Sequence, residues 1–179
     1  MGPRLHAEQP NQPEVRWATP ANALARIGNV LVFRDGSMPT VNDAKRLHAE
    51  ILAVASDYPE DGAVVLHVTP DIDDGYPSEE VRDAFLQLLR STRGEVRGVA
   101  YAILRKGLLG ATVRTVARAL FHAARIGKNG AVLDTLEEAA TWASQRSLVG
   151  ARDLASTWHM LGSVSQEASG RHPLIPPRR

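Results

Sequence analysis

Apolar residues are distributed along the chain in two alternating patterns: short continuous runs, and longer runs in which they recur every three or four residues. Continuous apolar runs are typical of strands buried inside a parallel sheet, and the wider spacing is typical of a helix with one buried face. Because the two patterns alternate, we expect an α/β domain whose parallel strands are joined by right-handed helical crossovers. The predicted strands are Asn29–Arg34, Ala63–Thr69, Val96–Leu104 and Ala131–Leu133, and the predicted helices are Thr40–Tyr58, Ser78–Arg90, Leu109–Arg125 and Leu136–Arg146.

Weaker strand patterns precede this core. Glu14–Thr19 and Ala23–Ile27 are separated by Pro20 and are predicted to be short antiparallel or edge strands. Residues 1–13 contain three prolines and few apolar side chains, a composition that predicts a disordered tail. We therefore place a single domain at residues 14–146.

The pattern weakens after residue 146. Residues 147–179 are predicted to form an extension with one short helix and then a loose tail that contains three prolines. An apolar stripe of Leu154, Trp158 and Leu161, together with Trp142, has two interpretations. It folds back to complete the core, or it forms a surface for a partner.

Composition narrows the function classes. The chain has 179 residues, a net charge of +1 and no cysteine. The charge gives no electrostatic case for binding nucleic acid or a membrane surface, and the lack of cysteine excludes disulfides, thiol nucleophiles and thiolate metal sites. No apolar run is long enough to span a bilayer, and residues 1–13 lack the apolar segment of a secretory signal. We expect a cytoplasmic protein without a membrane span.

Three segments resemble the STAS domain (sulfate transporter and anti-sigma-factor antagonist), and more closely its SpoIIAA-like bacterial branch. They are Val30–Gly36, Gly98–Ile103 and Val132–Trp142, and the resemblance covers residues 14–146. It implies a non-catalytic regulatory or protein-interaction module of a bacterial cytoplasm, without cofactor, acting on a protein partner or as a homodimer. The working surface would lie at the carboxyl ends of the strands, in Thr69–Ser78 and Gly107–Thr112.

The resemblance also implies a phosphorylated serine at the start of the helix after the second core strand. Ser78 is the only serine at that position. Glu79, Glu80 and Asp83 surround it with negative charge, which would repel an added phosphate. The kinase switch of the family is therefore not expected to operate here in its usual form.

An acidic loop precedes Ser78. Asp71, Asp73 and Asp74, with Ser78 and Arg118, are the residues that we assign to a partner surface. The alternative is a divalent-cation site, or an enzyme that uses Asp71 and Asp73 with a metal. The loop fails the EF-hand pattern, so a solvated loop is favoured and no metal is assigned.

A glycine-containing segment follows the third core strand. Exposed amides at a helix N-terminus can bind an anion, and nearby cations would assist. The alternative is that the glycines serve turn geometry, because the Walker pattern is absent. The alternative function is therefore binding of a small anionic or lipid-like ligand at the Gly107–Gly110 helix N-terminus, by the following residues: Arg105, Lys106, Gly107, Gly110, Thr112 and Arg114.

Two further features carry open alternatives. Arg114, Arg118, His122 and Arg125 form a basic stripe along one helix, which is a surface for an acidic partner or an ordinary solvated face. His67 lies among apolar residues of a strand, where it is a proton shuttle or a hydrogen-bonded core histidine. No serine-hydrolase elbow or zinc-protease motif is present, so no catalytic residue is assigned.

Overall fold

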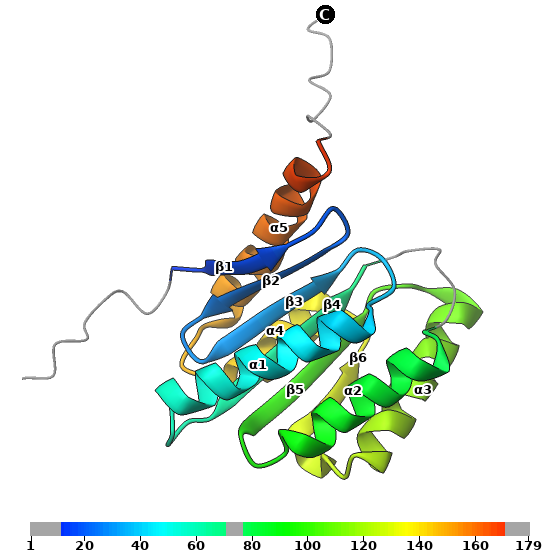
Figure 1. The fold of residues 1–179 in the computed structure, drawn as a ribbon, viewed down its shortest axis with the longest axis horizontal. Coiled ribbons are helices and arrows are strands. Elements are labelled where there is room, and N and C mark those ends of the chain that lie inside the picture. Colours follow the sequence, from blue (N-terminus) through cyan, green and yellow to red (C-terminus); the bar gives the residue numbers. More distant parts are fainter. Residues whose placement is uncertain (1–11, 71–76, 171–179) are drawn as a thin grey trace, which may run out of the picture.

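One six-stranded sheet with five α-helices forms the protein in the computed structural model, which describes residues 12–70 and 77–170 (Figure 1). The strands are β1 (Glu14–Ala18), β2 (Asn22–Ile27), β3 (Val30–Asp35), β4 (Ala63–Thr69), β5 (Val96–Ile103) and β6 (Gly130–Leu133). The helices are α1 (Val41–Asp57), α2 (Glu79–Ser91), α3 (Gly107–Ala123), α4 (Leu136–Ser144) and α5 (Ala151–Ala168), and a short 3₁₀ turn, η1 (Gly127–Asn129), precedes β6.

The strands lie in the sheet in the same order as in the chain, from β1 to β6. The first three pair antiparallel, whereas β3 to β6 run parallel and are connected through α1, α2 and α3. The predicted α/β class with a mostly parallel core is therefore confirmed. Of the two N-terminal strands, β1 takes the edge and β2 lies inside the sheet.

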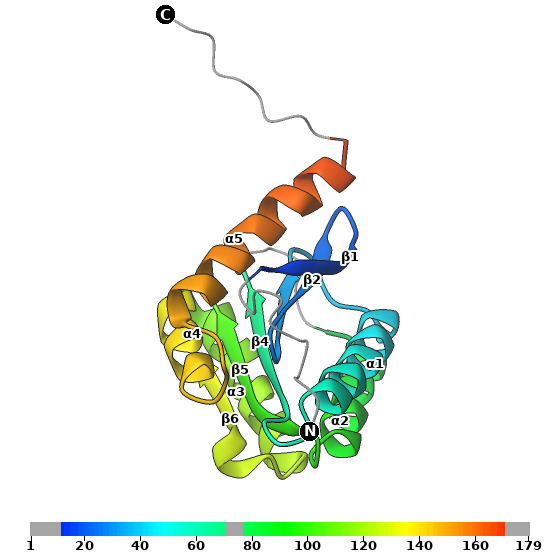
Figure 2. The ribbon, with the colours of Figure 1, turned by 90° about the vertical axis from the view of Figure 1, so that its left-hand side faces the viewer.

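Helices cover both faces of the sheet. Figure 2 shows α4 and α5 on one side and α1 and α2 on the other. Each face has its own core, because alternate residues of a strand point to opposite faces. Leu31, Phe33 and Val65 pack toward α1, and Val30, Val32 and Leu66 pack toward α4 and α5. β4 is buried along its whole length, as its continuous apolar run predicts.

Side-chain caps set the helix starts. Thr40 accepts a hydrogen bond from the amide of Asp43, whose carboxylate in turn accepts from the amide of Thr40. Ser78 accepts from the amide of Val81 at the start of α2. These caps satisfy amides that have no partner within the helix, which is why both helices begin where the sequence indicated.

The segment after α4 returns to the start of the sheet. α5 runs over 18 residues, longer than the sequence indicated, and packs against β1, β2 and β3. Leu154 and Leu161 are fully buried, and Trp158 is 9% exposed. The apolar stripe therefore completes the core, as the first of its two interpretations held.

α2 differs from the other helices because its main backbone neighbours are the helices α1 and α3, whereas each of the others has a strand among its own. Leu88 and Leu89 are its only buried residues, although Val81 and Phe85 also point inward from the same helix. Strands β4 and β5 consequently lie beneath a helix layer that does not fully close over them.

No helix in residues 12–70 and 77–170 combines the length and apolarity needed to cross a membrane.

Candidate functional site

A row of rings crosses the sheet beneath α2. Phe33, His67 and Tyr101 lie opposite one another on β3, β4 and β5. The His67 ring lies 4.3 Å from the Tyr101 ring with an interplanar angle of 16°, and 4.6 Å from the Phe33 ring. Phe85 of α2 stacks above His67 at 6.1 Å. The imidazole is thus fixed in orientation by rings on three sides.

Polar side chains meet at the carboxyl ends of the same strands. His67 Nε2 lies 2.9 Å from Asp35 Oδ2, and the Thr69 hydroxyl donates to the same oxygen over 2.9 Å. The Tyr101 hydroxyl lies 2.9 Å from Thr69 Oγ1. Asp35 is 1% exposed and His67 is 7% exposed. Four residues from three neighbouring strands therefore form one buried hydrogen-bond network.

The carboxylate of Asp35, at the centre of this network, determines the direction of each hydrogen bond. An ionised carboxylate only accepts, so His67 Nε2 carries the hydrogen that it shares with Asp35. Thr69 gives its hydrogen to Asp35, and Tyr101 therefore donates to Thr69. The other carboxylate oxygen of Asp35, and Nδ1 of His67, have no hydrogen-bond partner among the residues that the structure describes. In a neutral imidazole that carries its hydrogen on Nε2, Nδ1 is an acceptor.

The phenol of Tyr101 is strongly perturbed. Burial raises its pKa well above the ordinary value, and the negative charge of Asp35 raises it further, while the hydrogen bond with Thr69 opposes the change. The neutral phenol is therefore the form that the folded protein favours.

Tyr101 should make the protein sensitive to alkali. A tyrosine in the unfolded chain ionises at a pH of about 10, whereas Tyr101 keeps its proton in the fold, so its contribution to stability is complete below that pH and is lost above it. We expect the free energy of unfolding to fall by up to about 1.4 kcal/mol per pH unit above this point, and less steeply in Tyr101→Phe. Urea unfolding between about pH 8 and 11 measures both slopes, and equal slopes would contradict the prediction.

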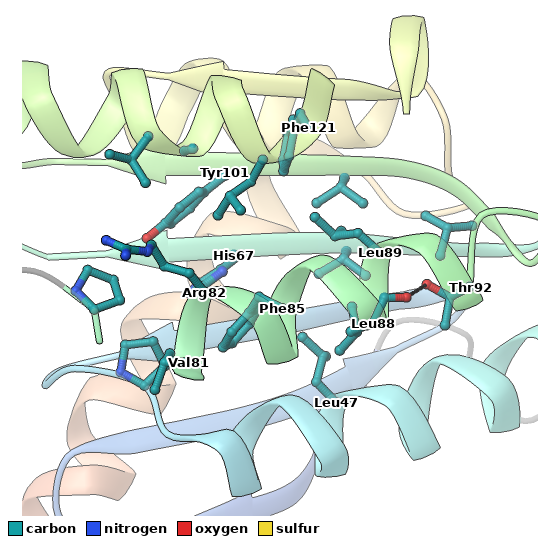
Figure 3. Close-up of a pocket in the computed structure, with 18 of the residues that line it drawn as sticks. Leu47, His67, Val81, Arg82, Phe85, Leu88, Leu89, Thr92, Tyr101 and Phe121 are labelled. Carbon is teal, nitrogen blue, oxygen red and sulfur yellow. Dashed lines mark hydrogen bonds between the residues drawn. The ribbon is translucent and has the colours of Figure 1, made fainter. Parts of the chain in front are cut away.

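A cavity of about 80 Å³ lies between α2 and the sheet (Figure 3). His67 and Tyr101 line it toward the carboxyl ends of the strands, and Thr92 lines it at the other end. The hydroxyl of Thr92 donates to the carbonyl of Leu88, so its polarity is satisfied locally. The remaining lining is mainly aliphatic and aromatic, with Arg82 of α2 beside the Tyr101 end.

The arrangement is suited to binding. His67 is the one cavity-lining residue of the described chain whose position is fixed by a buried carboxylate. The two hydroxyl groups that line the cavity, Thr92 and Tyr101, both have hydrogen-bond partners. No group of three or more His, Cys, Asp or Glu residues within residues 12–70 and 77–170 is placed to hold a metal ion.

The segment predicted to bind an anion, Arg105 to Arg114, has a different local structure from the one that the spacing of its glycines indicated. α3 begins at Gly107, two residues earlier than predicted, so Gly110 lies inside its first turn. Arg114 donates to the carbonyls of Ile103 and Arg105 and pairs with Asp134 over 3.0 Å. The Thr112 hydroxyl donates to the carbonyl of Leu108. Arg114 and Thr112 therefore serve the local fold.

The two glycines of this segment have separate structural reasons. Gly107 has φ of +76°, a conformation that favours glycine. A Cβ at Gly110 would collide with the carbonyl oxygen of Arg105. Lys106 precedes the helix and its side chain makes no capping bond, while Arg105 lines a smaller cavity of about 30 Å³ beside Asp35 and Tyr101. The geometry of the turn accounts for both glycines.

The residues assigned to a partner surface separate into three groups. Asp71, Asp73 and Asp74 lie outside the described residues. Ser78 caps α2. Arg118 lines a groove between α3 and β6 together with His122 and Arg125 of the basic stripe, and so stands apart from the cap of α2.

Sequence reasoning missed most of the network. His67 was considered, and the interpretation as a hydrogen-bonded core histidine is confirmed by its bond to Asp35. Thr69 is the first residue of the expected working surface Thr69–Ser78, whereas Asp35 follows a predicted strand and Tyr101 lies inside one, so the sequence assigns neither of these two a role. The common signal of all three is position: each lies at or near the carboxyl end of a predicted parallel strand, where side chains from neighbouring strands converge.

No family model, curated protein or solved structure matches the chain. The resemblance to STAS domains therefore stays a prediction.

Proposed function

We propose that this protein binds a small, mainly apolar molecule that carries one hydrogen-bond donor, such as an alcohol or a phenol. The single observation that carries the proposal is the cavity beneath α2, which ends at an imidazole held by a buried carboxylate. Binding sites of this kind are usually apolar pockets with a few well-placed polar groups.

The apolar part of the ligand would occupy the space between α2 and the strands. An engineered apolar cavity of about 150 Å³ accepts benzene, so a cavity of about 80 Å³ suits a smaller group unless its wall moves. α2 supplies that freedom, because it packs on α1 and α3 and buries few of its own residues. A ring-sized ligand would displace α2 outward, and the ligand itself would stay in contact with the sheet.

The donor of the ligand would meet His67 Nδ1. Asp35 holds the hydrogen on Nε2, which leaves Nδ1 as an acceptor without a partner in the described chain. A ligand hydroxyl that donates to this nitrogen satisfies it, whereas a methyl group in the same place does not. The network therefore supports selection of a hydroxyl over a group of equal size.

Phenol and toluene test both parts of the proposal, because they differ by a hydroxyl against a methyl group. We expect both to bind in calorimetric titration, phenol more tightly. His67→Phe keeps a ring in the stack and removes the acceptor, so it should weaken phenol binding about fivefold and leave toluene binding within about twofold. Glu80→Gln, at an exposed position of α2, is the control and should change neither.

The outcomes separate the two parts. If neither compound binds, the cavity is not a ligand site. If phenol and toluene bind equally well and His67→Phe affects neither, the donor site is wrong. Binding of benzoate without binding of phenol would favour the anionic ligand expected at Gly107–Gly110 and overturn this proposal.

A second candidate is the regulatory, non-catalytic protein-interaction module that the STAS resemblance implies. A groove beside β6 supports an interaction role, because it carries cations next to an edge strand. The two roles are compatible, since the cavity lies under α2 and the groove lies at the far side of α3.

A further inference from the structure

The groove lies between α3 and the last strand of the sheet. It has a volume of about 680 Å³. Gly130 and Val132 of β6 form one side and Phe121 of α3 forms part of the other. A Cβ on Gly130 would come within 2.6 Å of the Phe121 ring, so the absence of a side chain there lets the ring lie against the strand. The groove therefore follows the outer strand, with an apolar base.

β6 ends the sheet, so one side of its backbone pairs with β5 and the other has no strand beside it within the described chain. All four of its residues, Gly130 to Leu133, are partly exposed. None of them is charged or proline, the residues by which sheets usually protect an edge from further pairing. The edge is thus chemically able to accept another strand.

The helix beside this edge contributes positive charge. Arg118, His122 and Arg125 line the groove and are exposed. Neither Arg118 nor Arg125 has a carboxylate partner among the described residues. Asp134, which directly follows β6, is already paired with Arg114. The charge of the groove is therefore not neutralised by the residues that the structure describes around it.

Arg125 is held in an unusual backbone conformation. Its φ is +55°, and it is the one non-glycine residue of the described chain with positive φ. It follows α3 at the position where helices commonly end with glycine. Glycine would fit this turn better, so an arginine there is consistent with a need for its side chain beside the groove.

From these observations we propose that the β6 groove binds an extended peptide segment with acidic side chains, which adds a strand to the sheet. Backbone pairing with β6 would supply the affinity, as in other cases of strand addition. Alternate residues of an added strand point to opposite faces of the sheet, so its carboxylates would lie on the face that α3 covers, where they would pair with Arg118 and Arg125. The valine-sized side chains between them would lie on the opposite face.

A capped hexapeptide of alternating glutamate and valine tests the proposal against the full chain in calorimetric titration. We expect binding that weakens as the salt concentration rises from about 0.05 M to about 0.5 M. Arg118→Ala and Arg125→Ala should each weaken it about threefold to fivefold. The matched control is Arg152→Ala, on α5 at the opposite face of the sheet, which should leave the affinity unchanged.

Three further measurements decide the mode of binding. An N-methylated version of the peptide, which cannot pair along its backbone, should not bind, and a lysine–valine version should bind far more weakly. Arg125→Gly should raise the melting temperature of the protein and still lower its affinity for the glutamate–valine peptide. A general loss of structure cannot produce this combination. Equal binding of the lysine peptide, no binding of the glutamate peptide, or a dimer of this chain that Arg118→Ala dissociates would each overturn the proposal.

Discussion

Asp35→Ala should lower the free energy of unfolding by about 2–4 kcal/mol, because it leaves two buried donors without their acceptor. His67 Nε2 and the Thr69 hydroxyl both depend on the same Asp35 oxygen. The second Asp35 oxygen has no partner among the described residues, so its removal offsets part of the loss. Urea unfolding at neutral pH, with equal m values, measures the difference.

The companion variant distinguishes a lost network from a simple void. His67→Phe in the Asp35→Ala background removes one of the two stranded donors and keeps a ring between Phe33 and Tyr101. Replacing both partners of a buried polar pair by apolar groups is often close to neutral, so the double variant should regain about half of the lost stability, the Thr69 hydroxyl remaining without its acceptor. A double variant no more stable than Asp35→Ala alone would show that the hydrogen bonds are not the reason.

Ala117→Leu should abolish binding of phenol and toluene while raising stability. Ala117 is 4% exposed, lies on α3 and lines the cavity beneath α2. A leucine there places three further carbons in the space that the ligand would use. Filling a cavity commonly adds about 1 kcal/mol, which for a chain of this size raises the melting temperature by about 2–4 °C.

The control for this variant lies two residues away. Ala119 is exposed on the same helix, so Ala119→Leu makes the same chemical change outside the cavity. It should leave both the binding and the melting temperature nearly unchanged. If Ala117→Leu still binds phenol with unchanged affinity, the ligand does not occupy this cavity, whatever its effect on stability.

Most of the architecture was predictable because it rests on local patterns. The strand over Ala63–Thr69 was placed without error because seven successive residues are buried on both faces of the sheet. The start of α3 was misplaced by two residues, because Gly107 and Gly110 are read as a turn when only the sequence is known. The sequence underestimates the length of α5. The buried stripe of this helix packs on β1, β2 and β3, which are distant from it in sequence, so the local pattern does not show how far the contact extends.

The site was harder to predict, because its chemistry depends on register. Asp35, Thr69 and Tyr101 are separated by more than thirty residues from one another, and each is unremarkable within its own strand. Only the pairing of β3 with β4 and of β4 with β5 brings their polar atoms to one place. The cavity likewise depends on tertiary packing, because it lies where side chains of α1, α2 and α3 meet those of β4 and β5.

The order of strands in the sheet has a consequence for synthesis of the chain. Each strand from β2 onward pairs with the strand made just before it, so the sheet can grow one strand at a time as the chain leaves the ribosome. α5 breaks this rule, because it is made after all six strands and covers the first three. Until it emerges, the rear surface formed by Ala23, Ala25 and Ile27 has no cover, and a nascent chain stalled at that length would be a substrate for chaperones.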